Sequence, residues 1–127
     1  MKATAALLLA TLATACSTTP GTGWSRAPDL SVYSAMRLFG EVAQEQEIFC
    51  QGFRPAGVRR DWSADFAGRE ARIAAALASR HGAQALSDAE AAAVATRSVP
   101  CRDWPNDRWR DQYVRMLRLL EARLGLA

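Results

Sequence analysis

Apolar side chains recur at helical spacing in the middle of the chain, and this pattern constrains the fold most. The residues of this stripe are Trp62, Phe66, Ile73 and Leu77. Steps of four and seven residues return to the same side of an α-helix, so the four side chains share one face. Gly82, which follows the stripe, is a residue type typical of the position after a helix. The pattern predicts an amphipathic helix that begins within residues 58–61 and ends at Gly82, with Asp65 and Arg69 paired one turn apart.

Three other segments also carry helix signals. Residues 30–49 have apolar side chains on one face, and Gly52 and Pro55 follow as helix breakers. Ser87 and Glu90 have the spacing of a capping box, which predicts a short helix from Ser87 to about residue 97. A last helix is expected from residue 105 or 106 to Gly125. Its apolar stripe consists of Trp109, Tyr113, Met116, Leu117, Leu120 and Leu124.

Composition agrees with a helical fold, because alanine is abundant and the β-branched residues are sparse. Each amphipathic helix must bury its stripe against the others. The sequence therefore predicts an all-α domain over residues 29–127, a compact bundle of three long helices and one short helix.

The first fifteen residues have the layout of an exported protein's leader. Lys2 is followed by an apolar run that closes with small residues at Ala15, as a signal peptide requires. The run is shorter than the roughly 20 apolar residues of a membrane-spanning helix. We therefore expect residues 1–15 to be a signal peptide that is removed.

The end of this leader reads Leu12-Ala13-Thr14-Ala15-Cys16 and resembles the lipobox of bacterial lipoproteins, although that family usually has Leu where Ala13 lies. The resemblance implies that Cys16 is acylated and becomes the first residue. Ala13, Thr14 and Ala15 also fit an ordinary signal peptidase, which would cut the same bond. Ser17, rather than Asp, follows the cysteine, which by resemblance to Gram-negative sorting implies the periplasmic face of the outer membrane.

Three cysteines leave one thiol over in an exported protein. If Cys16 carries lipid, Cys50 and Cys101 remain, and in an oxidising compartment they can form a disulfide. The bridge closes a loop of about 50 residues, which corresponds to roughly 4 kcal/mol of stabilisation. Two buried free thiols are the alternative.

Residues 16–28 are rich in Ser, Thr, Gly and Pro and predict a flexible tether between lipid and domain. Trp24 interrupts this composition. Two interpretations of Trp24 remain open: an anchor at the lipid headgroups, or a side chain that folds back onto the domain.

Candidate chemistry is sparse. His81 is the only histidine and has no motif around it, and Glu41 and Glu45 lie one turn apart and project the same way. A glycosidase needs its two carboxylates on opposite sides of a substrate cleft. With no Cys-x-x-Cys and one histidine, we expect no metal site and no cofactor, and we interpret the protein as a non-enzyme.

Binding candidates are few as well. The net charge of +3 is carried by arginines interleaved with acids, which argues against nucleic acid as a partner. Arg54, Arg59 and Arg60 form a basic cluster that would bind anionic headgroups or an acidic protein, or pair with glutamates of the first helix at residues 45 and 47. Trp104, beside Pro105 in a predicted loop, is a candidate for protein contact if exposed.

Together these features predict an outer-membrane lipoprotein whose helical domain binds an envelope protein. In length, helix content, anchor and single disulfide, the layout is similar to the small helical pilotins that escort secretins. A structural or immunity-type envelope lipoprotein, and a peptidoglycan-active enzyme, are the alternatives.

Overall fold

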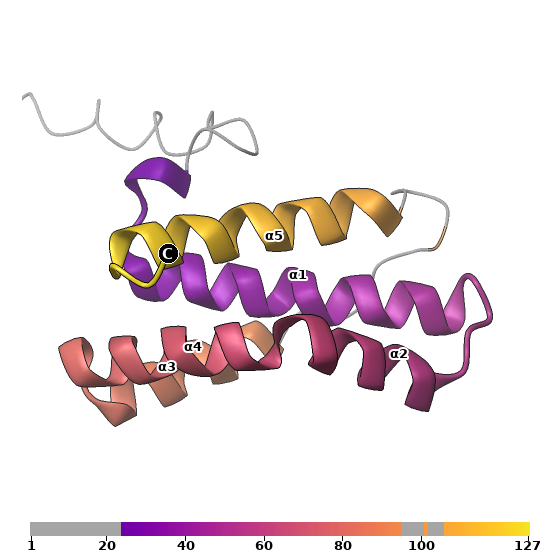
Figure 1. Ribbon diagram of the computed structural model, residues 1–127, viewed down its shortest axis with the longest axis horizontal. Helices are drawn as coiled ribbons and strands as arrows, with labels where there is room; N and C mark the ends of the chain where they lie inside the picture. Colours follow the sequence, from indigo (N-terminus) through magenta and orange to yellow (C-terminus); the bar gives the residue numbers. More distant parts are fainter. Residues whose placement is uncertain (1–23, 95–100, 102–105) are drawn as a thin grey trace, which may run out of the picture.

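The computed structural model describes residues 24–94, 101 and 106–127, and all regular structure in that part is helical (Figure 1). The elements are η1 Trp24–Arg26, α1 Asp29–Phe49, α2 Pro55–Trp62, η2 Ser63–Ala67, α3 Gly68–His81, α4 Ala83–Val94 and α5 Asn106–Arg123. The predicted all-α fold is confirmed. None of the helices in these residues is long and apolar enough to cross a bilayer.

Successive helical rods run in alternating directions, with α1 between α5 on one side and α2 and α3 on the other (Figure 1). At one end of the bundle, Arg123 at the end of α5 pairs with Asp29 at the start of α1, at 3.0 Å. Midway along α1, Arg37 pairs with Glu70 of α3 at 2.8 Å. The rods are thus α1, the continuous run α2–η2–α3, α4 and α5, in the up-down-up-down order of four-helix bundles.

The core is formed by the stripes expected from the sequence. Its largest fully buried side chains are Tyr33, Met36, Ile73, Leu77, Tyr113, Met116, Leu117 and Leu120. Trp62, Phe66 and Tyr113 form an aromatic cluster in which each pair of ring centroids lies 4.8 Å apart. Burying such rings stabilises a small bundle, because each removes a large apolar area from water.

Gly40 allows this cluster to approach α1. A β-carbon at Gly40 would lie 3.0 Å from Cδ2 of Tyr113 and 3.3 Å from Cζ2 of Trp62, closer than carbon atoms normally pack. The position therefore favours a residue without a side chain, since a β-carbon would require the two rings to move by a few tenths of an ångström away from the backbone of α1.

The second predicted helix is present but begins earlier and contains an irregular turn. It starts at Pro55, whose fixed φ suits the first turn of a helix. The turn Ser63–Ala67 is π-helical, with Phe66 buried within it. Such a turn inserts one extra residue, which hydropathy periodicity does not reveal.

The predicted capping box at Ser87 is wrong, because α4 begins at Ala83. Gly82, with φ of +93°, ends α3 and turns the chain, and good helix formers follow at once. The Glu90 carboxylate does not cap a helix; it accepts a hydrogen bond from the Tyr33 hydroxyl at 2.9 Å.

The predicted tether extends too far into the chain, because residues from Trp24 onward belong to the domain. Arg123 donates hydrogen bonds to the carbonyl oxygens of Trp24, Ser25 and Ala27, at 2.6 to 3.1 Å. Trp24 is half-buried against the core. The folded-back interpretation of Trp24 is therefore confirmed, and a tether can extend no further than residue 23.

Candidate functional site

The end of α1 and the start of α2 form a cleft at the end of the bundle opposite η1. α1 stops at Phe49, and Gly52, with φ of +74°, turns the chain toward Pro55. The cleft encloses about 420 Å³. We call it the aromatic cleft, and its lining consists of Glu47, Phe53, Arg54, Gly57, Val58, Asp61, Trp62, Asp65 and Arg110.

Two phenylalanines at this end are exposed, and they are the only exposed large hydrophobic side chains in the described residues. Phe49 is 77% exposed and Phe53 is 57% exposed. Small helical bundles bury such side chains where they can, so exposed apolar rings are typical of a contact surface, and Phe53 also lines the aromatic cleft.

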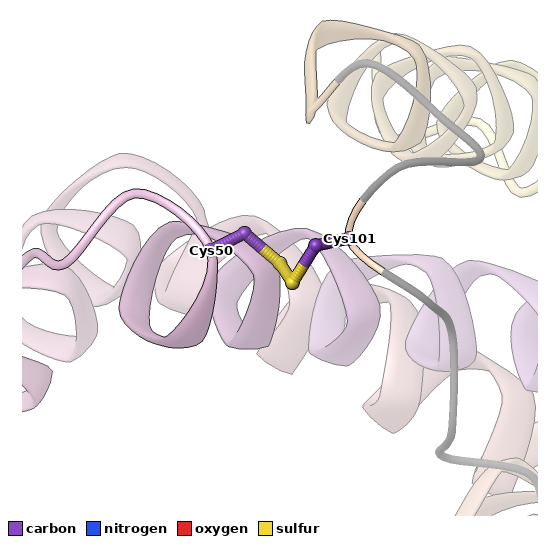
Figure 2. Close-up of a disulfide and its surroundings, with 2 residues drawn as sticks. All are labelled: Cys50 and Cys101. Atoms are coloured by element: carbon purple, nitrogen blue, oxygen red, sulfur yellow. A yellow bond between two sulfur atoms is a disulfide. The ribbon is translucent and has the colours of Figure 1, made fainter.

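The predicted disulfide is confirmed and lies at the same end. Cys50 caps the C-terminus of α1, and its Cα lies 5.5 Å from that of Cys101 (Figure 2). Both cysteines are exposed. The bridge fixes the end of α1 to the segment that precedes α5, and so it constrains the chain beside the aromatic cleft.

The arginines predicted as a basic cluster separate into three environments. Arg54 lines the aromatic cleft and has no carboxylate partner among the described residues. Arg59 pairs with Glu41 at 3.3 Å and donates to Gln44 at 2.9 Å. Arg60 pairs with its neighbour Asp61 in full exposure. The expected pairing of Arg59 with the glutamates at 45 and 47 is therefore wrong. Its partner is Glu41, which lies one turn before residue 45 on α1 and faces α2.

The other predicted residues are dispersed. His81 is exposed at the last residue of α3, and Glu41 is engaged by Arg59. No three His, Cys, Asp or Glu side chains of residues 24–94, 101 and 106–127 form a metal-binding group. Trp104 and Cys16 lie outside the described residues.

Two glutamates that lie on the apolar faces of their helices form ion pairs that the sequence did not predict. Glu121, on the buried side of α5, accepts two hydrogen bonds from Arg69 of α3, at 2.5 and 3.0 Å. The predicted pair between Asp65 and Arg69 is wrong, because Asp65 binds Arg110 instead. A bidentate contact with a largely buried carboxylate outweighs an exposed pair within one helix, which is worth only a few tenths of a kcal/mol.

Glu70 is the second such carboxylate. It accepts hydrogen bonds from Arg37 at 2.8 Å and from the Tyr113 hydroxyl at 2.5 Å. Burial, with the hydrogen bond to Glu70, raises the pKa of Tyr113 above its ordinary value. Burial and the Glu90 hydrogen bond raise the pKa of Tyr33 likewise. Both phenols therefore remain neutral donors. The sequence did contain a signal for the Glu70 contacts: a glutamate placed between Phe66 and Ile73 on the apolar face of the helix.

Replacement of Glu121 by glutamine is expected to lower the free energy of unfolding by about 2 kcal/mol at pH 7. Hydrogen bonding by Arg69 is the main cause that lowers the pKa of Glu121 below its usual value. The Glu121 carboxylate therefore contributes its full stabilisation above the pKa of an unfolded glutamate, about 4.3. This stabilisation is lost as the pH falls through the lower pKa that Glu121 has in the folded protein. Denaturant melts at pH 7 and pH 3 should show the wild-type advantage shrinking. Glu41→Gln, which removes an exposed pair, is the control and should cost less than about 1 kcal/mol. An unchanged difference at pH 3 would contradict this role.

A second groove lies between α1 and α4 and is mainly apolar. It encloses about 550 Å³, and Trp24 lies at its margin. Its walls are formed largely by small side chains of α4, among them Ala85, Ala89 and Ala92. Asp88 is the one titratable residue in its described lining, so this groove lacks the side chains of a catalytic site and suits an apolar group.

Comparison of the chain with protein-family models, with curated proteins and with solved structures finds no match.

Proposed function

We propose that this protein is a non-enzymatic lipoprotein on the periplasmic face of the outer membrane, and that its helical domain binds another envelope protein through the aromatic cleft. The anchor is the acylated Cys16 implied by the lipobox resemblance. The domain is the helical bundle that the Cys50–Cys101 disulfide closes. That disulfide supports the anchor as well, since it uses the other two cysteines of the chain and leaves only Cys16 over.

One observation supports the binding role above the others: the exposed Phe53 lines a cleft, and the exposed Phe49 lies at the adjoining end of α1. The cleft contains apolar surface from Trp62 and Val58, and Arg54 in its lining has no carboxylate partner within the described part of the chain. A groove that combines apolar surface with charged groups suits a short segment of protein chain, which contacts it through both apolar side chains and hydrogen bonds.

The position of the cleft favours the same role. η1, where the chain arrives from Cys16, lies against the end of α5, whereas the cleft lies at the other end of α1 (Figure 1). A helix of 21 residues is about 31 Å long. A lipid at Cys16 would therefore leave the cleft free of the attachment point.

A structural or immunity-type lipoprotein would use the same surface with a different partner. An enzyme acting on peptidoglycan is a weaker proposal, because Glu41 is held by Arg59, His81 is exposed at a helix end, and neither lines the aromatic cleft. Two carboxylates that do line the cleft, Asp61 and Asp65, are paired with Arg60 and Arg110.

Site-specific photo-crosslinking in living cells tests the proposal. A benzoyl-phenylalanine in place of Phe49 or Phe53 is expected to give one crosslinked species of the same mass at both positions, containing one envelope protein. The same reagent at Ala91, exposed on α4, is the control and should not give that species. Equal crosslinking at all three positions, or none at the cleft, would remove the binding role.

A further inference from the structure

The arginines of this domain are unequally neutralised. In the described residues, carboxylate partners elsewhere on the bundle are held by Arg37, Arg59, Arg60, Arg110 and Arg123. The exposed side of α3 and α5 differs, because several arginines surround a single buried carboxylate there. We call this surface the basic face, and it comprises Arg69, Arg72, Arg115 and Arg118.

Glu121 is the acid at the centre of the basic face. Arg69 hydrogen-bonds it directly, and the charges of Arg72 and Arg118 also act on it. One carboxylate is shared by three guanidinium groups, so two positive charges remain uncompensated. Arg72 and Arg118 form no ion pair among the described residues and are exposed.

Arg115 extends the basic face along α5. It lies three residues before Arg118, so the two side chains are neighbours on the helix surface. Arg115 is exposed and has no partner in the described part of the chain. The acid closest in sequence is Asp111, one turn earlier. Two carboxylates, at 111 and 121, therefore face four arginines over this surface.

The helix α4 carries a different charge. The carboxylates of Asp88 and Glu90 lie on α4, where Asp88 accepts a bond from Gln84 and Glu90 from Tyr33. α4 has no arginine within Ala83–Val94. The domain thus has a basic side formed by α3 and α5 and an acidic side on α4, which gives it a preferred orientation in front of a charged surface.

The basic face and the chain segment that leads to Cys16 lie toward the same end of α5, on different sides of that helix. Arg123, which holds η1, is five residues beyond Arg118, a rise of about 7.5 Å along α5. From Cys16 to Trp24 the chain spans at most about 28 Å when fully extended. A chain fixed to a bilayer at Cys16 would therefore hold the basic face within reach of the lipid headgroups.

From this arrangement we infer that the basic face docks on an anionic lipid surface, with Arg72, Arg115 and Arg118 contacting phosphate groups. The nearness of the membrane rests on the proposed lipid anchor, whereas the charge arrangement does not. The contact supplements the lipid, because each arginine close to an anionic leaflet adds electrostatic attraction, which salt screens out beyond a separation of about 8 Å. It would leave α4 and the aromatic cleft away from the bilayer.

Vesicle binding of the full chain carrying Cys16→Ala tests this inference without the lipid. Co-sedimentation is measured with vesicles of phosphatidylcholine alone and with vesicles containing 30% phosphatidylglycerol. Binding to the neutral vesicles records what the leader contributes. We expect tighter binding to the anionic vesicles, and we expect this preference to fall about thirtyfold in Arg72→Gln/Arg118→Gln.

Arg54→Gln/Arg60→Gln is the matched control, because it removes the same charge from exposed positions at the other end of the bundle. It should retain most of the preference, and 0.5 M NaCl should abolish the preference in every variant. Thermal melts confirm that both double variants are folded. Equal binding to the two vesicle types, or equal loss in both double variants, would overturn the basic face as a lipid-docking surface. Either result is independent of whether Cys16 is acylated.

Discussion

Replacing Cys50 and Cys101 together by serine is expected to lower the free energy of unfolding by about 4 kcal/mol. The two residues are 51 apart, so the bridge removes much of the freedom of the unfolded chain, and loop closure of that length gives a value of this size. Small domains are marginally stable, and 4 kcal/mol is a large part of the total. Urea denaturation of wild type and variant, both under oxidising conditions, measures the difference.

Dithiothreitol supplies the control. Both cysteines are exposed, so the reductant reaches the bridge in the folded protein. Reduced wild type should unfold at the urea concentration of the double variant, whereas the double variant should not respond to the reductant. A wild type whose midpoint is the same with and without dithiothreitol would show that the bridge contributes nothing to stability.

Cys16→Ala is expected to abolish palmitate incorporation and release the protein from the membrane. The proposed anchor consists of acyl chains on this one residue, and each buried methylene adds about 0.8 kcal/mol of membrane affinity. Attraction by the basic face alone is weak and sensitive to salt. In fractionated cells, the variant should therefore appear in the soluble periplasmic fraction, while the wild type sediments with membranes.

The matched control is Cys50→Ser/Cys101→Ser, which removes two thiols and leaves Cys16. It should incorporate label as wild type does, although the folded domain is less stable. Label in Cys16→Ala at the wild-type level would place the acyl chains elsewhere or show that labelling is unspecific. Retention of unlabelled Cys16→Ala on membranes in 0.5 M salt would contradict the anchor as the main attachment.

The helices were predictable because their apolar residues repeat at the helical period. Trp62, Phe66, Ile73 and Leu77 are all buried on one face, as expected. The boundaries were less predictable where local signals compete. Ser87 and Glu90 match a capping box, but Gly82 ends α3 five residues earlier, so the next helix has already begun. The Glu90 carboxylate instead accepts a hydrogen bond from Tyr33 of α1. Tertiary contacts of this kind leave no trace in local spacing.

The candidate site was predictable only in part. The expectation of export, together with the count of three cysteines, was sufficient to predict the Cys50–Cys101 bridge. The cleft beside it depends on how α1 and α2 meet after Gly52, which periodicity does not specify. The basic face was missed for a related reason: Arg72 and Arg118 are far apart in sequence, and only the packing of α3 against α5 brings their charges together around Glu121.

The intact mass of the protein extracted from membranes, measured without reduction after alkylation of free thiols, tests the central claim most directly. We expect a chain that begins at Cys16, carries the added mass of fatty acyl chains and is not alkylated, because Cys50 and Cys101 are bridged. A mass that retains residues 1–15, lacks acyl groups and includes alkylated cysteines would contradict it.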